Sequence, residues 1–324
     1  MKTKRIKLAA LLLLLSTLNS QLSTVLAQGG LTPPGAPAPT MKTLDQVEPR
    51  TDVLKLSGDG NSLFIIIQPG SYYLTTNIVG VAGRNGISIA SGNVTLDLRG
   101  FALLGVPGSF RGVYVSSTYT NITVRNGTVS GWTSGVDAYN FGSPRNVVIE
   151  RLTVSANGGD GIEGGNACLI RDCLSYNNGS TGIYCNSGQV RDCVVRDNGT
   201  IGIDVTPGMV SGCLAQNNGR SGIYVDAPGS EVTGNTCIGN NTSLSAGHAG
   251  IYINDSNNRI EGNHVSASGI LGIKVNSPTY VNNVVIKNTV SDNGVNNYAG
   301  TAGNDFGPVG TAAASTSPWA NISH

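Results

Sequence analysis

One short phrase recurs eight times along the chain, and its spacing restricts the fold more than any other feature. Gly followed by Ile or Val opens the segments GVYV, GVDA, GIEG, GIYC, GIDV, GIYV, GIYI and GIKV, which start at residues 112, 135, 161, 182, 202, 222, 250 and 272. Successive copies are 20 to 28 residues apart. Apolar and variable residues alternate within each copy, which is typical of a strand with one buried face. The repeat therefore predicts one such strand per structural unit.

Each repeat holds too little chain for a helical crossover. A second strand, a third short strand and a turn rich in Asn and Gly follow each phrase, as in YNNGS, RDNGT and QNNGR. Parallel strands that are joined through a helix need a longer connection. A coil of three strands that stacks on the next coil satisfies the spacing. We therefore predict an all-β fold, a single-stranded parallel β-helix solenoid of about eight to ten coils, with the coils one strand spacing apart.

One position of the unit is occupied by Cys or Asn in most copies. It falls on Arg151, Cys173, Cys193, Cys213, Asn235, Asn263 and Asn288. We expect a ladder, because Asn amides can hydrogen-bond to the coils above and below and Cys can fill the same small site. Stacked Cβ atoms about 4.8 Å apart are too distant for a usual disulfide, so these cysteines are predicted to be free. The sequence allows one disulfide among Cys168, Cys185 and Cys237 and does not fix its pairing.

The two ends of the chain differ in composition from the repeats. Residues 1–27 place four basic residues before an apolar run and are predicted to be a secretory signal peptide, and residues 28–40 a Pro- and Gly-rich linker. Residues 41–84 are expected to hold a short N-terminal capping helix and the first coil, and residues 85–298 the β-helix repeats. Residues 299–324 are expected to be a C-terminal tail along the last coils, anchored by Trp319.

The charge balance and the predicted signal limit the partners and the compartment. Without residues 1–27, 16 Lys and Arg remain of the 20, against 19 Asp and Glu, so the formal charge is near −3. A nucleic-acid partner is therefore not expected. No transmembrane segment is expected after signal cleavage, because the apolar run at the start is too short to span a bilayer. We expect a bacterial protein that is secreted, periplasmic or held at the outer surface.

Several phrases resemble a known superfamily. NVTLDLRGFALLG, NITVRNGTVSGW and the GI-x-V repeats resemble the right-handed parallel β-helix proteins of the pectate-lyase-like superfamily, over about residues 60 to 295. The segments LTPPGAPAPTMKTLDQVEPRT, QPGSYYLT and GPVGTAAASTSPWANIS are similar, more narrowly, to a group of uncharacterised secreted bacterial β-helix proteins. The resemblance implies a right-handed solenoid, and fold alone does not choose an activity.

The polygalacturonase-like glycosidases are the sharpest comparison within that superfamily. They carry an Asn-Thr-Asp phrase, an Asp-Asp pair one coil on and a Gly-His-Gly phrase. Asp160 in NGGDGIE falls where the first Asp would fall, and His248 in GHAG lies one residue out of register. STGIYC occupies the place of the Asp pair. Polygalacturonase activity is therefore not expected, and His248 is expected to be a polar turn residue.

The variable residue of each GI-x-V phrase is expected to point outward, so these residues should form a row across the coils. The row consists of Tyr114, Asp137, Glu163, Tyr184, Asp204, Tyr224, Tyr252 and Lys274. Tyrosine rings can hold sugars, acids can bind calcium or exchange protons, and a lysine can act as a base. The candidate catalytic residues are Asp204, Lys274 and Glu163. The candidate substrate-binding residues are Tyr184, Tyr224, Tyr252 and Asp226, and calcium is the cofactor considered, with no residue assigned to a metal.

Three functions remain open at this point. The first is a secreted β-helix that binds polysaccharide or another surface through the Tyr and acid row. The second is a polysaccharide lyase or hydrolase that acts on an acidic glycan; the superfamily's lyases use a basic residue, usually with calcium, beside a uronate carboxylate. The third is a structural component of an envelope or matrix. The row alone does not decide, because outward strand positions are ordinarily polar and Tyr is favoured in strands.

Overall fold

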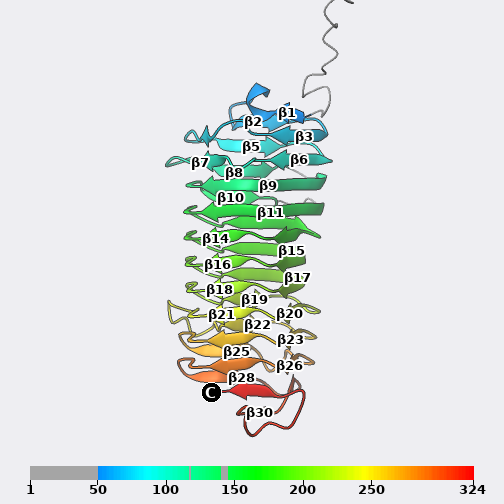
Figure 1. The fold of residues 1–324 in the computed structure, drawn as a ribbon, viewed down its shortest axis with the longest axis vertical. Coiled ribbons are helices and arrows are strands. Elements are labelled where there is room, and N and C mark those ends of the chain that lie inside the picture. The colour runs from blue at the N-terminus through cyan, green and yellow to red at the C-terminus, as the bar shows by residue number, and fades with distance from the viewer. Residues whose placement is uncertain (1–49, 117, 140–144) are drawn as a thin grey trace, which may run out of the picture. The chain divides into compact units, whose positions relative to one another are not determined.

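The computed structural model describes residues 50–116, 118–139 and 145–324, which form a stack of parallel strands in about 11 turns (Figure 1). The predicted all-β parallel solenoid is confirmed, with slightly more coils than expected. The predicted signal peptide, linker and capping helix lie outside the described residues. Within those residues, the one helical turn is η1 (Val53–Lys55), and no helix is long and apolar enough to cross a membrane.

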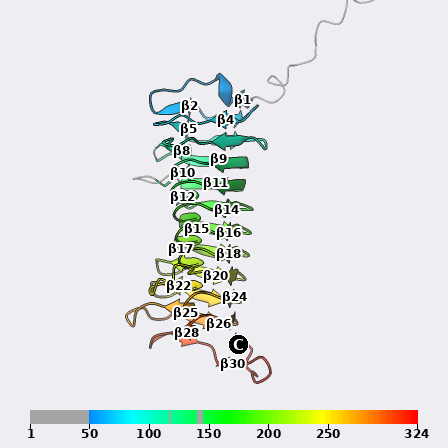
Figure 2. The same ribbon diagram turned by 90° about the vertical axis from the view of Figure 1, so that its left-hand side faces the viewer.

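Each coil contributes one strand to each of three sheets, and every sheet runs the length of the stack (Figures 1 and 2). The first sheet contains β2 (Ser62–Ile66), β5 (Asn85–Ile89), β8 (Arg111–Val115), β10 (Ser134–Asp137), β12 (Ile162–Asn166), β15 (Ile183–Arg191), β17 (Ile203–Ser211), β19 (Ile223–Val225), β22 (Ile251–Ile253), β25 (Leu271–Val275) and β28 (Asn296–Ala299). This sheet carries the GI-x-V phrases.

The second and third sheets complete each coil, and four long strands turn a corner between two sheets. The second sheet contains β1 (Arg50–Asp52), β3 (Gly70–Tyr73), β6 (Val94–Asp97), β9 (Thr120–Ser130), β11 (Arg145–Ser155), β13 (Leu169–Arg171), the ends of β15 and β17, β20 (Glu231–Thr233), β23 (Arg259–Glu261), β26 (Val284–Ile286) and β29 (Asp305–Phe306). The third contains β4 (Ile78–Val79), β7 (Ala102–Leu104), the ends of β9 and β11, β14 (Leu174–Tyr176), β16 (Val194–Arg196), β18 (Leu214–Gln216), β21 (Thr236–Ile238), β24 (His264–Ser266), β27 (Thr289–Ser291), β31 (Asn321–Ser323) and β30 (Val309–Gly310).

The core is a column of stacked aliphatic side chains inside the coils. The isoleucines of successive GI-x-V phrases pair in register, as Ile183 does with Ile203, and both are fully buried. Burial of one such side chain contributes about 1.5 to 3 kcal/mol. The preceding glycine is needed because of packing: a Cβ on Gly182 would lie 2.4 Å from Cγ1 of Val195. The repeated Gly-Ile therefore fixes both the depth and the register of each coil.

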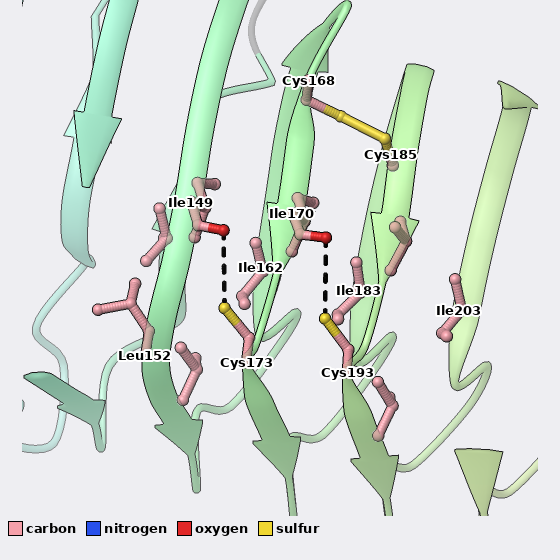
Figure 3. Packing of buried hydrophobic residues seen from close by; sticks show 14 of the residues in the cluster. Ile149, Leu152, Ile162, Cys168, Ile170, Cys173, Ile183, Cys185, Cys193 and Ile203 are labelled. Carbon is pink, nitrogen blue, oxygen red and sulfur yellow. Dashed lines mark hydrogen bonds between the residues drawn. A yellow bond between two sulfur atoms is a disulfide. The ribbon is translucent and has the colours of Figure 1, made fainter. Parts of the chain in front are cut away.

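The predicted cysteine ladder is confirmed. The strands that follow Cys173, Cys193 and Cys213 pair in register, and all three thiols are free and buried. Each thiol donates to a carbonyl of the preceding coil; the Cys173 Sγ lies 3.7 Å from the Ile149 oxygen (Figure 3). The expected start of the ladder at Arg151 is wrong by one residue. Thr153 pairs with Leu174, so Leu152 occupies the position equivalent to Cys173 on the preceding coil.

Asparagines extend this ladder and form a second one at another corner of the coil. Nδ2 of Asn263 donates to Oδ1 of Asn288 at 3.0 Å and to the Val232 carbonyl at 2.9 Å. The second ladder runs through Asn157, Asn178, Asn198, Asn218 and Asn240. These buried amides satisfy backbone groups that the tight turns leave without strand partners.

The structure also shows the disulfide pairing and how the C-terminal tail packs. Cys168 and Cys185, on adjacent coils, form a disulfide, and Cys237 is free and buried (Figure 3). The tail packs on the last coils through β31, which pairs with β27. The expectation that Trp319 anchors it is wrong, because that side chain is 51% exposed while Asn321 is fully buried and bonded to Asn288.

Candidate functional site

The predicted outward row is one continuous column on the first sheet. Strand pairing places Glu163 beside Tyr184, Tyr184 beside Asp204, and Asp204 beside Tyr224. The full column, in register from coil to coil, is Tyr114, Asp137, Glu163, Tyr184, Asp204, Tyr224, Tyr252 and Lys274. Neighbouring members are therefore one strand spacing apart. Asp226 lies just past the end of β19, at the edge of the column.

Glu163 lies at the most perturbed point of the column. Burial, together with the nearby charges of Asp137 and Asp160, raises the pKa of its carboxyl to about 8. The rings of Tyr139 and Tyr184 meet edge to face with centroids 4.8 Å apart, from the coils on either side of Glu163. Glu163 is therefore protonated near neutral pH, on the coil between those that carry Tyr139 and Tyr184.

Asp204 is the second perturbed carboxyl. Burial, together with the charges of Asp226 and Asp160, raises its pKa to about 7. Its Oδ1 is buried and has no hydrogen-bond partner among the described residues. A buried carboxylate oxygen without a partner is costly, so burial here favours the protonated form of Asp204.

Two further charged groups shape the electrostatics around Glu163. Nε of Arg111 donates to Oδ2 of Asp137, and its guanidinium lies 4.7 Å from the ring centroid of Tyr114. Burial nevertheless raises the pKa of Asp137, although the arginine opposes that effect. Oδ1 of Asp160 accepts the backbone N–H of Thr181 at 2.7 Å. Arg111 is thus already engaged with a carboxylate of the column.

The C-terminal half of the column is a stack of rings. Tyr224 and Tyr252 lie nearly parallel, with centroids 5.3 Å apart and planes 9° from each other. Nζ of Lys274 lies 5.3 Å from the Tyr252 ring centroid. Tyr252 is only 5% exposed, so its ring faces are covered and cannot serve as an open platform for a sugar. Lys274 is three coils from Asp204, so the structure does not bring these two candidate catalytic residues together.

Asp226 and His248 border this stack. Oδ1 of Asp226 accepts the Tyr224 hydroxyl at 3.2 Å and Nδ2 of Asn254 at 2.7 Å. His248 lies in the turn before β22, where Nδ1 is 3.0 Å from Oγ of Ser221 and the ring is 5.6 Å from that of Tyr252. Burial lowers the pKa of His248, and the nearby cations Arg220 and Lys274 lower it further. His248 is therefore neutral at pH 7.

Sequence reasoning missed two residues of this site. Tyr139 and Arg111 lie outside the variable position of the repeat. The spacing of the repeat does not show which side chains are long enough to contact a neighbouring coil. Their only sequence signal is the presence of an aromatic or basic residue within three positions of the column. Among residues 50–116, 118–139 and 145–324, no three His, Cys, Asp or Glu side chains are grouped so that they could hold a metal ion.

The stack of parallel strands places the chain in a class of folds. The chain is a right-handed parallel β-helix of the pectate-lyase-like fold. Residues 63–210 match the family described as the right handed beta helix region. No curated protein sequence matches the chain significantly.

Solved structures share this fold at low sequence identity. The A-module of the mannuronan C-5 epimerase AlgE4 from Azotobacter vinelandii is 15% identical, with a TM-score of 0.51 over 85% of this chain and 88% of that one. The periplasmic alginate epimerase AlgG is 12% identical, with a TM-score of 0.50 over 85% of this chain and 82% of that one. The Dettilon tailspike protein is 17% identical, with a TM-score of 0.47 over 77% of this chain and 52% of that one. These similarities concern the fold.

Proposed function

We propose that the chain is an exported protein that binds a polysaccharide along the outward column, with the centre of the site at Tyr139, Glu163, Tyr184 and Asp204. The observation that carries the proposal is the register of the column, which aligns half-buried tyrosines with two carboxyls of raised pKa. The fold similarity to a mannuronan and an alginate epimerase supports a polysaccharide ligand. The signal-like residues 1–27 support export to the periplasm or beyond.

The chemistry of the column suits the hydroxyl groups of a sugar chain. A protonated Glu163 can donate to a sugar oxygen, and the half-buried carboxyl of Asp204 can accept from a hydroxyl. Tyr139 is 41% exposed and Tyr184 half-buried, so their rings offer apolar contact beside these polar groups. The acids of the column outnumber its cations. An acidic glycan is therefore expected to bind weakly unless calcium offsets the repulsion.

A second function, a polysaccharide hydrolase or lyase, is favoured by the two raised pKa values. A carboxyl that is protonated near neutral pH suits a general acid. Glu163 and Asp204 are two coils apart, so their backbones are separated by roughly 9.6 Å. This is just beyond the separation of the two carboxyl groups in inverting glycosidases, about 6.5 to 9.5 Å. The lyase variant has less support, because Lys274 packs on Tyr252 and lies three coils from Asp204.

The test is to incubate the exported chain with a panel of neutral and acidic polysaccharides, with and without calcium. Co-sedimentation reports binding, and new reducing or unsaturated ends report cleavage. Retention without new ends is the expected result. New ends that disappear in Glu163→Gln or Asp204→Asn would establish the enzyme instead. Absence of both retention and cleavage across the panel would refute both functions and leave a structural role.

A further inference from the structure

A second candidate binding site lies on the second sheet, near the C-terminal end of the stack. A pocket of about 380 Å³ opens there beside β23, β26 and β29. Its lining includes Arg259, Val284, Asp305, Phe306, Ser317 and Trp319. The GI-x-V column is on the first sheet, so this pocket shares no residue with the site described above.

The position of Trp319 is fixed by the structure around it. Asn321, two residues later, is fully buried and closes the asparagine ladder, with its Oδ1 3.0 Å from the backbone nitrogen of Asn288. The Trp319 carbonyl oxygen occupies the space beside Gly307, where a Cβ would approach it to 2.2 Å. The backbone N–H of Trp319 donates to Oγ of Ser317 at 3.2 Å. The pocket is therefore preorganised, which lowers the entropic cost of binding.

The exposure of Trp319 is unusual for a residue held so firmly. Its side chain is 51% exposed, whereas the other tryptophan of the chain, Trp132, is 2% exposed. Nζ of Lys287 lies 4.5 Å from the Trp319 ring centroid. An exposed aromatic side chain that lines a pocket together with a few polar groups is typical of a ligand-binding site.

The polar groups of this pocket are balanced in charge. Glu261 accepts from Lys287 Nζ at 2.7 Å and from Arg259 Nε at 2.7 Å. Asp305 contributes a further carboxylate to the lining. The lining thus holds one cation and one carboxylate, Arg259 and Asp305, and the ion pair of Lys287 with Glu261 lies beside it. Hydrogen-bond donors and acceptors of no net charge beside an aromatic ring fit a neutral ligand with many hydroxyl groups and an apolar face.

We propose that this pocket binds a neutral hexopyranose unit of a polysaccharide, with the sugar packed against Trp319 and its hydroxyls bonded to Arg259 and Asp305. This second glycan site goes beyond the proposed function of the column and does not depend on it. Two sites on different sheets would let the protein hold two chains, or two segments of one chain.

The experiment follows the emission of Trp319, because Trp132 is buried and insensitive to added quenchers. The full chain is titrated with cellohexaose, mannohexaose and, as a charged comparison, hexagalacturonate. A neutral hexasaccharide is expected to change the emission saturably and to protect it from iodide quenching. Calorimetry is then carried out in a Tyr184→Ala background, which disables the column. There, Trp319→Ala is expected to weaken binding about tenfold, equal to about 1.4 kcal/mol.

Three results would overturn the proposal: no saturable response to either neutral hexasaccharide, tighter binding of hexagalacturonate, or equal affinities with and without Trp319→Ala. Should Trp319→Ala fail to fold, Arg259→Gln serves instead and is expected to weaken the emission-detected affinity severalfold. A response that disappears in Tyr184→Ala alone would assign the ligand to the column and refute the second site. Failure of the column to bind, by contrast, would leave the Trp319 response intact.

Discussion

Replacement of Glu163 by Gln tests the electrostatics of the column, because Gln has nearly the shape of the protonated carboxyl and cannot ionise. The pKa of Glu163 rises from 4.5 to about 8 on folding. At about 1.4 kcal/mol per pH unit this interval corresponds to nearly 5 kcal/mol, and the partial exposure of the side chain reduces the expected effect to about 2 kcal/mol.

The direction of the change in folding stability with pH follows from proton binding by Glu163. Below pH 4.5 the folded and unfolded chains both carry the proton, so the carboxyl does not penalise folding. Between pH 4.5 and about 8 the unfolded chain releases it while the folded chain retains it, so stability falls as the pH rises. The Gln variant lacks this loss. We therefore expect nearly equal stabilities at pH 4 and a variant that is more stable than the natural protein by about 2 kcal/mol at pH 9.

Urea unfolding at pH 4, 7 and 9, followed by circular dichroism, measures the effect. Asp204 should keep its own titration in the variant, because Glu163 is not among the groups that raise its pKa. Glu231→Gln, a half-buried carboxyl on β20 of the second sheet, is the matched control and should follow the natural protein. Parallel curves for Glu163→Gln and the natural protein across this range would refute the reasoning.

Three further predictions concern the solenoid itself. Asn263→Ala removes four ladder hydrogen bonds and should lower the free energy of unfolding by about 2 to 4 kcal/mol in urea. Asn254→Ala, which removes solvent-exposed hydrogen bonds to Asp226 and Asn276, should change it by less than about 1 kcal/mol. Gly182→Ala drives a methyl group into Val195 and should lower the thermal midpoint, with a loss of about 1 to 3 kcal/mol. Ellman's reagent should find no thiol in the native protein and the four buried free cysteines after unfolding.

The fold and the column were predictable because the period of the repeat determines both. A slip of one residue would turn every Ile of the GI-x-V phrases outward, so the hydrophobic pattern allows only one register. The error at Arg151 arose where the repeat is least regular. There β11 continues through the corner without an Asn or Cys, and Arg151 takes a left-handed backbone conformation with φ of +52°.

The details of the site were less predictable, because they depend on reach between coils. Tyr139 meets Tyr184 across the intervening coil, and Arg111 pairs with Asp137 from the previous coil. The Cys168–Cys185 pairing joins positions that are not equivalent in the repeat, so no count of spacings could identify it. The ring stack that covers Tyr252 depends on side-chain orientation rather than on register.

The central claim is that the column on the first sheet is a polysaccharide-binding face. The most direct measurement compares the retention of two single variants on the polysaccharide that the natural protein binds best. Tyr184 lies in the column, whereas Tyr176 is a half-buried tyrosine on β14 of the third sheet, packed under Arg196. If the column is the binding face, Tyr184→Ala loses retention and Tyr176→Ala keeps it. Equal retention by both variants would contradict it.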